Sequence, residues 1–282
     1  MEVMFPPEDN AVFRLARWVG LLPSNLESRR VAQIEFLNDR QADEHNRRDT
    51  LFFYVKMGRL SSVKLLLDGI KDDEKRRAKV KERDFQGANA IHVAYLYGRY
   101  EVAHYLVEMF PEAGILPYGR ERRVGGRSIE LPYAGETVLH MCIVSKNFDE
   151  VRWLLEFYRQ RIYSLRKSHN DSALRQLLQT QVTGDFFRIG RPTYFGETPL
   201  HFAACTNDPE MFDLVLAYTT EEFPRALFSL DRHGNNLLHI CVLRELKKMY
   251  KHVLETARRE LENIIRNLLS AYLEKPYATW SK

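Results

Sequence analysis

The chain has 282 residues, of which 45% are hydrophobic and 28% charged, and its formal net charge at pH 7 is +4. This composition can bury a sizeable core, and so small a net charge gives little support to a nucleic-acid-binding function. No stretch reaches the roughly 18 consecutive apolar residues of a membrane helix. The N-terminus, with Glu2, Glu8 and Asp9, lacks the pattern of a signal peptide. We therefore expect no membrane span in this chain.

Residues 1–45 precede a repetitive region and contain one predicted helix, from Ala11 to Leu22. Its apolar residues alternate at helical spacing with Arg14 and Arg17, which is typical of an amphipathic helix. Such a helix could cap the end of a repeat array, or it could bind a membrane surface or a partner. Further on, the mixed-charge segment from Lys71 to Arg83 is predicted to be a solvated connector or helix extension.

An internal repeat dominates the middle of the chain. A glycine is followed five residues later by a histidine in four places: Gly87–His92, Gly135–His140, Gly196–His201 and Gly234–His239. The glycine suits a tight turn with positive φ, and a helix-capping residue follows two positions later. These caps are Asn89, Thr137, Thr198 and Asn236, and Pro199 follows one of them at the first helical position.

A second helix is predicted in each unit, because an apolar pair stands 14 and 15 residues after each histidine. The pairs are Leu106-Val107, Leu154-Leu155, Val215-Leu216 and Val253-Leu254. A weaker unit lies upstream, with Asp49 as its cap, Phe52 at the histidine position and Leu66-Leu67 as its pair. Gly58, Gly98 and Asn207 follow the histidine position by six residues and suit a left-handed turn after the first helix.

This turn-helix-helix unit, with its Thr-Pro-Leu-His start, resembles the ankyrin repeat. The resemblance implies an all-α ankyrin-repeat solenoid of about five repeats with long finger loops. We divide the chain into an N-terminal segment (1–45), the repeats (46–257) and a C-terminal amphipathic helix or tail (258–282). His92, His140, His201 and His239 recur once per repeat, so we interpret them as structural residues that link neighbouring turns rather than as metal ligands.

Two long insertions interrupt the array. The histidines are 48, 61 and 38 residues apart, whereas the usual ankyrin period is about 33. The excess residues are predicted to leave the array as loops at about Ala113–Pro132 and Ser164–Tyr194. Insertions of this kind project from one face, which is often the binding face.

The second insertion narrows the resemblance. It reads Gly-Asp-Phe-Phe from Gly184 and runs through Tyr194-Phe195 into Gly-Glu-Thr-Pro-Leu-His and Ala-Ala-Cys-Thr-Asn, which ends at Asn207. This finger resembles the cytosolic ankyrin domain of vanilloid-subfamily transient receptor potential (TRPV) channels, with a leaning towards the invertebrate branch. TRPV proteins are tetrameric, often calcium-permeable cation channels. Their fingers pack against a neighbouring subunit, and calmodulin or another regulatory protein is a further expected partner.

The resemblance implies an interface made by aromatic and arginine side chains, the residue types that most often anchor protein interfaces. The alternative is that the aromatic residues fold back and stiffen their own finger. The expected interface residues are Phe186, Phe187, Arg188, Arg191, Tyr194 and Phe195.

Nucleotide binding is not expected, and no cofactor is predicted. Some TRPV proteins bind ATP through two lysines of the second unit, and these positions hold Ala88 and Val93 here. Without those lysines a phosphate group loses most of its electrostatic attraction. Arg47, Arg48, Tyr133 and Glu136 still match the family. The sequence contains no phosphate loop, nucleophile motif or metal spacing, so no enzyme is predicted.

The chain ends in a predicted amphipathic helix after the fifth unit. Leu254, Leu261 and Leu268 are spaced by seven residues. The helix could cap the last repeat, bind a groove or calmodulin, or pair with itself. We expect a channel module on the cytosolic side of the plasma or ciliary membrane. The alternative is a free-standing soluble ankyrin adaptor. The absence of a membrane region leaves three explanations open, which are a fragment, a short isoform and an incomplete gene model.

Three cysteines bear on the cellular setting. Cys142, Cys205 and Cys241 show no paired spacing, and each is predicted to lie on a first helix just after a repeat histidine. Small apolar residues pack at such positions, so we expect buried thiols in a reducing, cytosolic environment.

Overall fold

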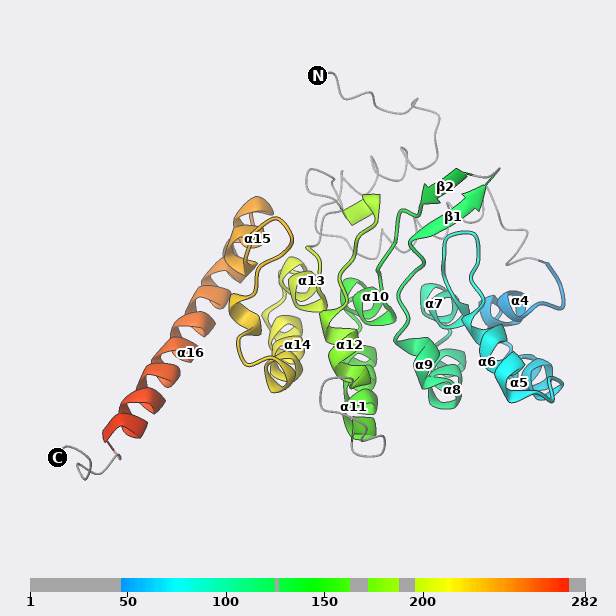
Figure 1. Cartoon of the computed structure of the whole chain (residues 1–282), viewed down its shortest axis with the longest axis horizontal. Coiled ribbons are helices and arrows are strands. Elements are labelled where there is room, and N and C mark those ends of the chain that lie inside the picture. Colours follow the sequence, from blue (N-terminus) through cyan, green and yellow to red (C-terminus); the bar gives the residue numbers. More distant parts are fainter. Residues whose placement is uncertain (1–46, 125–126, 163–171, 188–195, 274–282) are drawn as a thin grey trace, which may run out of the picture.

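A computed structural model describes residues 47–124, 127–162, 172–187 and 196–273 of the chain. The described residues form a row of helix pairs that stack side by side, with loops on one edge and a long final helix at the C-terminal end (Figure 1). The expected helical solenoid is therefore confirmed. The pairs are α4 (Leu51–Lys56) with α5 (Leu60–Asp68), α7 (Ala90–Leu96) with α8 (Tyr100–Met109), α10 (Val138–Val144) with α11 (Phe148–Ile162), α13 (Pro199–Cys205) with α14 (Pro209–Glu222), and α15 (Leu237–Leu243) with α16 (Lys247–Leu273).

The predicted helix starts are confirmed in four units. The four repeat glycines have φ between 78° and 85°, a backbone conformation that residues with a Cβ seldom adopt. The predicted caps precede α7, α10, α13 and α15, and Pro199 occupies the first turn of α13. The first unit differs by one residue. Thr50, rather than Asp49, caps α4, because its hydroxyl accepts a hydrogen bond from the Phe53 N–H.

The first helix of each unit also ends as predicted. Gly58, Gly98 and Asn207 have φ of 70°, 64° and 54°. Lys146 and Glu245 occupy the equivalent positions after α10 and α15 with φ of 52° and 55°. All five units therefore make the same left-handed turn, although two of them use residues that adopt it at a cost.

The core runs along the row between the helix pairs. Each first helix contacts the first helix of the next unit, from α4 through α7, α10 and α13 to α15. The predicted pairs in α8, α11 and α14 are all buried, and so is Val253 of α16. Leu254, the second member of the last pair, is exposed. The core is thus continuous along the array and stops at α16.

The first insertion is more ordered than a plain loop. It begins with the short helix α9 (Pro111–Gly114) and continues as the antiparallel strands β1 (Glu121–Val124) and β2 (Arg127–Glu130). Glu121 pairs with Glu130, and Val124 pairs with Arg127. This hairpin adds a small β element to the helical array and projects from its loop edge (Figure 1).

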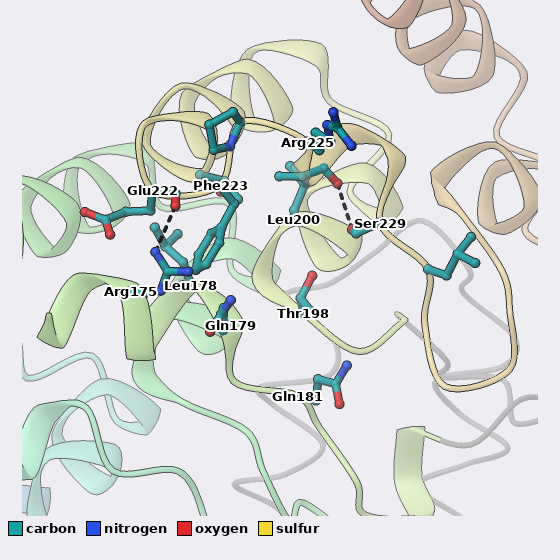
Figure 2. A pocket seen from close by; sticks show the side chains of 14 residues that line it. Arg175, Leu178, Gln179, Gln181, Thr198, Leu200, Glu222, Phe223, Arg225 and Ser229 are labelled. Carbon is teal, nitrogen blue, oxygen red and sulfur yellow. Dashed lines mark hydrogen bonds between the residues drawn. The ribbon is translucent and has the colours of Figure 1, made fainter. Parts of the chain in front are cut away.

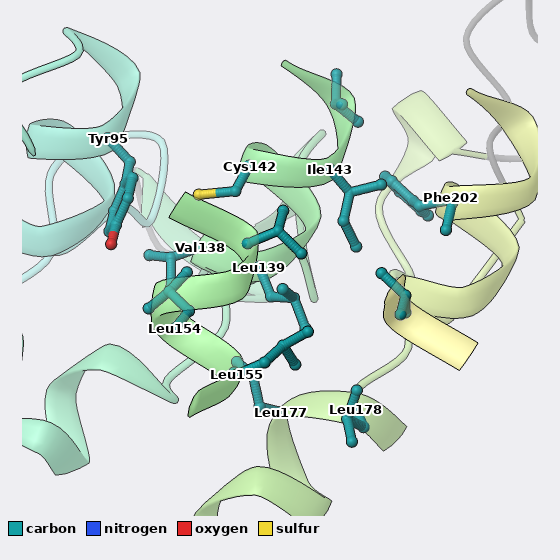
Figure 3. Close-up of a cluster of buried hydrophobic side chains, with 14 of the residues drawn as sticks. Tyr95, Val138, Leu139, Cys142, Ile143, Leu154, Leu155, Leu177, Leu178 and Phe202 are labelled. Carbon is teal, nitrogen blue, oxygen red and sulfur yellow. The ribbon is translucent and has the colours of Figure 1, made fainter. Parts of the chain in front are cut away.

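The second insertion contains a helix that the sequence pattern did not indicate. This helix, α12 (Ala173–Gln179), begins after Ser172, whose hydroxyl accepts a hydrogen bond from the Arg175 N–H. Leu174, Leu177 and Leu178 are buried. Figure 3 shows Leu177 and Leu178 below Leu155 of α11, at the edge of the same core. A part of the presumed loop therefore belongs to the packed array.

Two charged segments also take helical form. The connector expected after the first unit contains α6 (Asp73–Lys81), which is capped by Asp72 and buries Val80. At the C-terminal end α16 runs without a break across residues 257 and 258, where the sequence suggested a boundary. The predicted helix at residues 11–22 lies outside the described residues. Among the described helices, none is both long enough and apolar enough to cross a membrane.

Candidate protein-interaction site

The repeat histidines stabilise the N-termini of the first helices through hydrogen bonds. The Nδ1 atoms of His92, His140, His201 and His239 each accept a hydrogen bond from the backbone N–H of their cap residue, at 3.1–3.3 Å. His140 also reaches the next unit, because its Nε2 lies 3.3 Å from the carbonyl oxygen of Glu197. No cluster of histidine, cysteine and acidic residues suited to a metal ion occurs in the described part of the chain.

Burial makes two of these histidines poor bases. The side chains of His92 and His201 are almost wholly inaccessible to solvent. Removal from water disfavours the charged imidazolium. Burial lowers the pKa of His92 to about 3 and that of His201 to about 4. Both rings are therefore neutral at physiological pH and act as hydrogen-bond acceptors in the array.

The first finger, residues 115–131 with the β1–β2 hairpin, is tied to the turn of the second unit. The Gly119 N–H donates to the Gly87 carbonyl at 2.9 Å. The Arg83 guanidinium donates to the carbonyls of Gly87 and Pro117, at 2.6 and 2.7 Å. A Cβ on Gly87 would lie only 2.7 Å from the Gly119 nitrogen. The approach of the two backbones therefore fixes where the hairpin leaves the array.

The second finger starts from an aromatic cluster that we call the finger base, formed by Tyr133, Phe186, Phe187 and Phe202. Phe186 and Phe187 lie in the 3-10 turn η1 (Asp185–Phe187) and are only 7% and 4% exposed. The Phe186 ring centroid lies 5.0 Å from that of Tyr133, and the Phe187 centroid lies 5.6 Å from that of Phe202.

Backbone contacts hold this cluster against the turn of the third unit. The N–H groups of Thr183 and Gly184 donate to the Ala134 carbonyl at 2.8 and 3.0 Å, and the Phe186 N–H donates to the Pro132 carbonyl at 3.1 Å. A Cβ on Gly184 would come within 2.1 Å of the Pro132 oxygen. Only glycine allows this approach.

The finger base contains two of the expected interface residues. Phe186 and Phe187 are buried within their own chain against Tyr133 and Phe202. This burial agrees with the alternative in which the aromatic residues stiffen their own finger, and their contact with a neighbouring subunit stays a prediction. The other four expected residues lie outside the described residues, namely Arg188, Arg191, Tyr194 and Phe195.

An ion pair between the buried Glu197 and the half-exposed Arg232, which sequence reasoning missed, joins the end of the second finger to the fifth unit. The Glu197 carboxylate is buried and accepts from the Arg232 Nε at 2.6 Å and from the Arg232 backbone N–H at 3.1 Å. The same guanidinium donates to the Val182 carbonyl at 3.3 Å. The repeat pattern places Glu197 directly after a turn glycine, but its partner is 35 residues away in sequence.

A groove of about 660 Å³ lies beside α12, α14 and the 3-10 turn η2 (Ala226–Phe228) (Figure 2). Its apolar wall includes Leu178, Leu200 and Ala226, all buried. The Arg175 guanidinium lies 4.2 Å from the centre of the Phe223 ring and donates to the Glu222 carbonyl at 3.1 Å. An apolar floor with a few fixed polar groups is the usual composition of a binding groove.

The positions considered for nucleotide binding are not brought to one surface. Ala88 and Val93 are buried, and so are Tyr133 and Glu136. Arg47 and Arg48 are exposed at the start of the described chain. The matching residues therefore form no common exposed site.

The helix pairs form an ankyrin-repeat fold, and a family profile described as "Ankyrin repeat" matches residues 195–219. These residues cover α13 and most of α14. Ankyrin repeats are a binding architecture, so this fold favours a protein-interaction role over an enzymatic one.

The chain is similar in sequence to channels of one subfamily. The chain is 32% identical over 171 residues to transient receptor potential cation channel subfamily V member 6 of Homo sapiens. This alignment covers 60% of this chain and 18% of that protein. It is 31% identical over 170 residues to subfamily V member 5 of Homo sapiens, with 60% and 19% covered. It is 34% identical over 113 residues to subfamily V member 1 of Oryctolagus cuniculus, with 39% and 11% covered.

These comparisons confirm the resemblance to TRPV channels that the finger motif indicated. The match is partial, because the aligned part of the chain spans about a fifth of the length of the human relatives. The chain therefore has an ankyrin-repeat array similar to part of a TRPV cation channel.

Proposed function

We propose that the chain is the cytosolic ankyrin-repeat module of a TRPV-like, calcium-permeable cation channel. In this role it mediates subunit assembly and regulatory protein contacts on the cytosolic side of the plasma or ciliary membrane. The observation that carries the proposal is the similarity to subfamily V channels over 60% of the chain. The array also holds the start of each finger with backbone hydrogen bonds.

The geometry supports fingers as assembly elements because their bases are fixed. The first finger is held by Arg83 and the second by Gly184 and the buried aromatic cluster. A projecting loop that starts from a rigid base loses less conformational freedom when it binds. In our proposal the residues beyond Phe187 contact a neighbouring subunit in a tetramer, with Arg188, Arg191, Tyr194 and Phe195 as the contacts.

The domain division follows the same scheme. Residues 46–257 form the repeat module, residues 1–45 precede it, and residues 258–282 begin within α16. Calmodulin or another regulatory protein is proposed as a second partner. The N-terminal part of α16, which carries Lys247, Lys248 and Lys251, is a suitable basic surface for an acidic regulator.

The assembly role can be tested by co-purification of the tagged chain with subfamily V channel subunits expressed in the same cells. We expect the chain to co-purify with the channel. Replacement of both Tyr194 and Phe195 by alanine should reduce the yield at least tenfold, since interface aromatic residues carry much of the binding energy. Phe187→Ala is unsuitable here, because it would disturb the finger base. Arg225→Ala, on an exposed residue of the groove, serves as the matched control.

The alternative function is a free-standing ankyrin adaptor, and the groove beside α12 favours it. In that case the chain should bind a soluble partner, and substitutions in the groove should weaken binding more than those in the finger. Unchanged channel binding by the Tyr194 and Phe195 variant, together with loss by an Arg175→Ala and Gln179→Ala variant, would contradict the finger proposal. That result would support the adaptor.

A further inference from the structure

The last described repeat keeps the apolar pattern of an interior repeat, and no further repeat covers it among the described residues. Val242 and Leu243, at the end of α15, are 63% and 55% exposed. They stand three and four residues after the repeat histidine. The residues at these positions in the three preceding units are all buried, namely Tyr95, Leu96, Ile143, Val144, Ala204 and Cys205.

The second helix of the last repeat shows the same contrast. Leu254 of α16 is 47% exposed, whereas its counterparts Val107, Leu155 and Leu216 are buried. In the interior of the array, consecutive repeats contact each other through their first helices, and the second helices α5 and α8, and α11 and α14, are also in contact. The C-terminal face is therefore built for a contact that the described part of the chain does not supply.

The apolar surface continues along α16 beyond the array. Figure 1 shows the second half of this helix extending past α15, away from the other repeats. Leu261, Ile264, Ile265, Leu268 and Leu269 are exposed there. At 100° per residue they fall on one side of the helix together with Leu254, as a stripe wider than a strict coiled-coil seam. We call Val242, Leu243, Leu254 and these five residues the open end.

The opposite side of α16 is solvated and charged. Arg258 interrupts the stripe, because it falls between Ile265 and Leu269 around the helix, and its Nε donates to the Glu262 carboxylate at 3.0 Å. Glu255, Arg259 and Arg266 follow on the polar side and are exposed. The charges of this region are mixed, so they provide no strong attraction to an anionic membrane or to an acidic partner. A hydrophobic protein surface is the better complement.

We propose that the open end is a self-association surface, on which a second copy of this chain docks so that α16 of each copy covers the open end of the other. The eight side chains expose on the order of 700 Å² per copy, close to the roughly 800 Å² per partner of a stable protein interface. A single patch that meets its own copy gives a closed two-fold dimer. This contact is separate from the fingers and does not depend on their role in channel assembly.

The pairing predicts a strong effect of charge within the stripe. A glutamate at position 261 or 268 would be desolvated in the interface without a partner, which costs far more than the lost apolar area. Asn263 and Ser270 have the same seven-residue spacing but lie on the opposite side of α16, where both are exposed. Glutamates at these two positions would stay in water and leave the contact intact.

The test is the mass of the purified chain, residues 1–282, by sedimentation equilibrium from about 1 to 100 µM, a range that spans typical transient dimers. The wild type and the Asn263→Glu, Ser270→Glu control should form a dimer. The Leu261→Glu, Leu268→Glu variant should weaken it at least 100-fold and keep the helical circular dichroism of the wild type. A second probe is Leu261→Cys. The three native cysteines are buried, so the added thiol would be the accessible one, and it should form a disulfide-linked dimer on mild oxidation.

Three results would overturn the proposal. One is a wild type that stays monomeric at 100 µM. Another is a dimer that survives both glutamates at positions 261 and 268. The third is equal weakening by the control pair, which would assign the effect to charge rather than to the stripe. Failure of finger binding to channel subunits would leave this result unchanged, so the two proposals are tested separately.

Discussion

The finger base and the open end are both rich in large apolar side chains, but the structure gives them opposite surroundings. Phe186 and Phe187 are covered by residues of neighbouring turns of the same chain. Leu268 and Val242 are more than half exposed. Residue type alone therefore does not distinguish a core residue from an interface residue in a repeat protein. What decides it is whether residues of a neighbouring unit cover the position.

The largest expected effect is a difference in stability between the two regions. Phe187→Ala should lower the free energy of unfolding by about 3–5 kcal/mol, because it leaves a cavity against Tyr133 and Phe202. Leu268→Ala should lower it by less than about 1 kcal/mol in the monomer, since the side chain is mostly in water. Urea unfolding at about 1 µM, below the expected dimer range, measures both. Equal losses would contradict the contrast between buried base and exposed end.

A second prediction concerns pH and the buried histidines. In the unfolded chain the histidine pKa is about 6.5, whereas burial lowers it to about 3 for His92 and about 4 for His201. Between these values the unfolded chain binds more protons than the folded chain. Their contribution to stability is therefore complete above pH 6.5 and is lost as the pH falls below it. The expected slope is roughly 1.4 kcal/mol per pH unit for each histidine.

The measurement is urea unfolding at several pH values between 6.5 and 4.5, for the wild type and for His201→Gln. Glutamine retains a hydrogen-bond acceptor and does not titrate. The variant should show a pH slope about 1.4 kcal/mol per unit shallower than that of the wild type. Parallel slopes would mean that protonation of His201 does not oppose folding.

The smallest expected effect is at the left-handed turns, which the interior and the end of the array share. Lys146 and Glu245 adopt φ of 52° and 55°, and the equivalent positions in two other units are the glycines Gly58 and Gly98. Lys146→Gly and Glu245→Gly should each stabilise the chain by up to about 1 kcal/mol, because strain in the folded state outweighs the added freedom of the unfolded chain. Thermal unfolding of both variants checks this. A loss of stability in either would show that its side chain contributes more than its turn costs.

The features that the sequence predicted well are local ones. A cap and its histidine are three residues apart, and the turn glycine stands just before them. The order of residues therefore specifies the helix start directly, as at Asn89 and His92. The first unit was misplaced by one residue, because Asp49 and Thr50 are both good caps and only the contact with the Phe53 N–H distinguishes them.

The features that the sequence did not predict depend on distant contacts. Phe186 is buried by Tyr133, 53 positions earlier in the chain. The Glu197–Arg232 ion pair joins residues of different units. The helix α12 lies in a segment without repeat spacing, and its burial against the third and fourth units gives it a role in the core. None of these partners can be read from short-range spacing.

The most direct test of the contrast is amide hydrogen exchange along the whole chain at about 1 µM and about 100 µM, because exchange reports local opening. We predict slow exchange at both concentrations for Gly184, Phe187 and α13. Residues 258–270 of α16 should exchange quickly in the dilute sample and be protected in the concentrated one. Fast exchange at the finger base, or protection of α16 that does not change with concentration, would contradict the account.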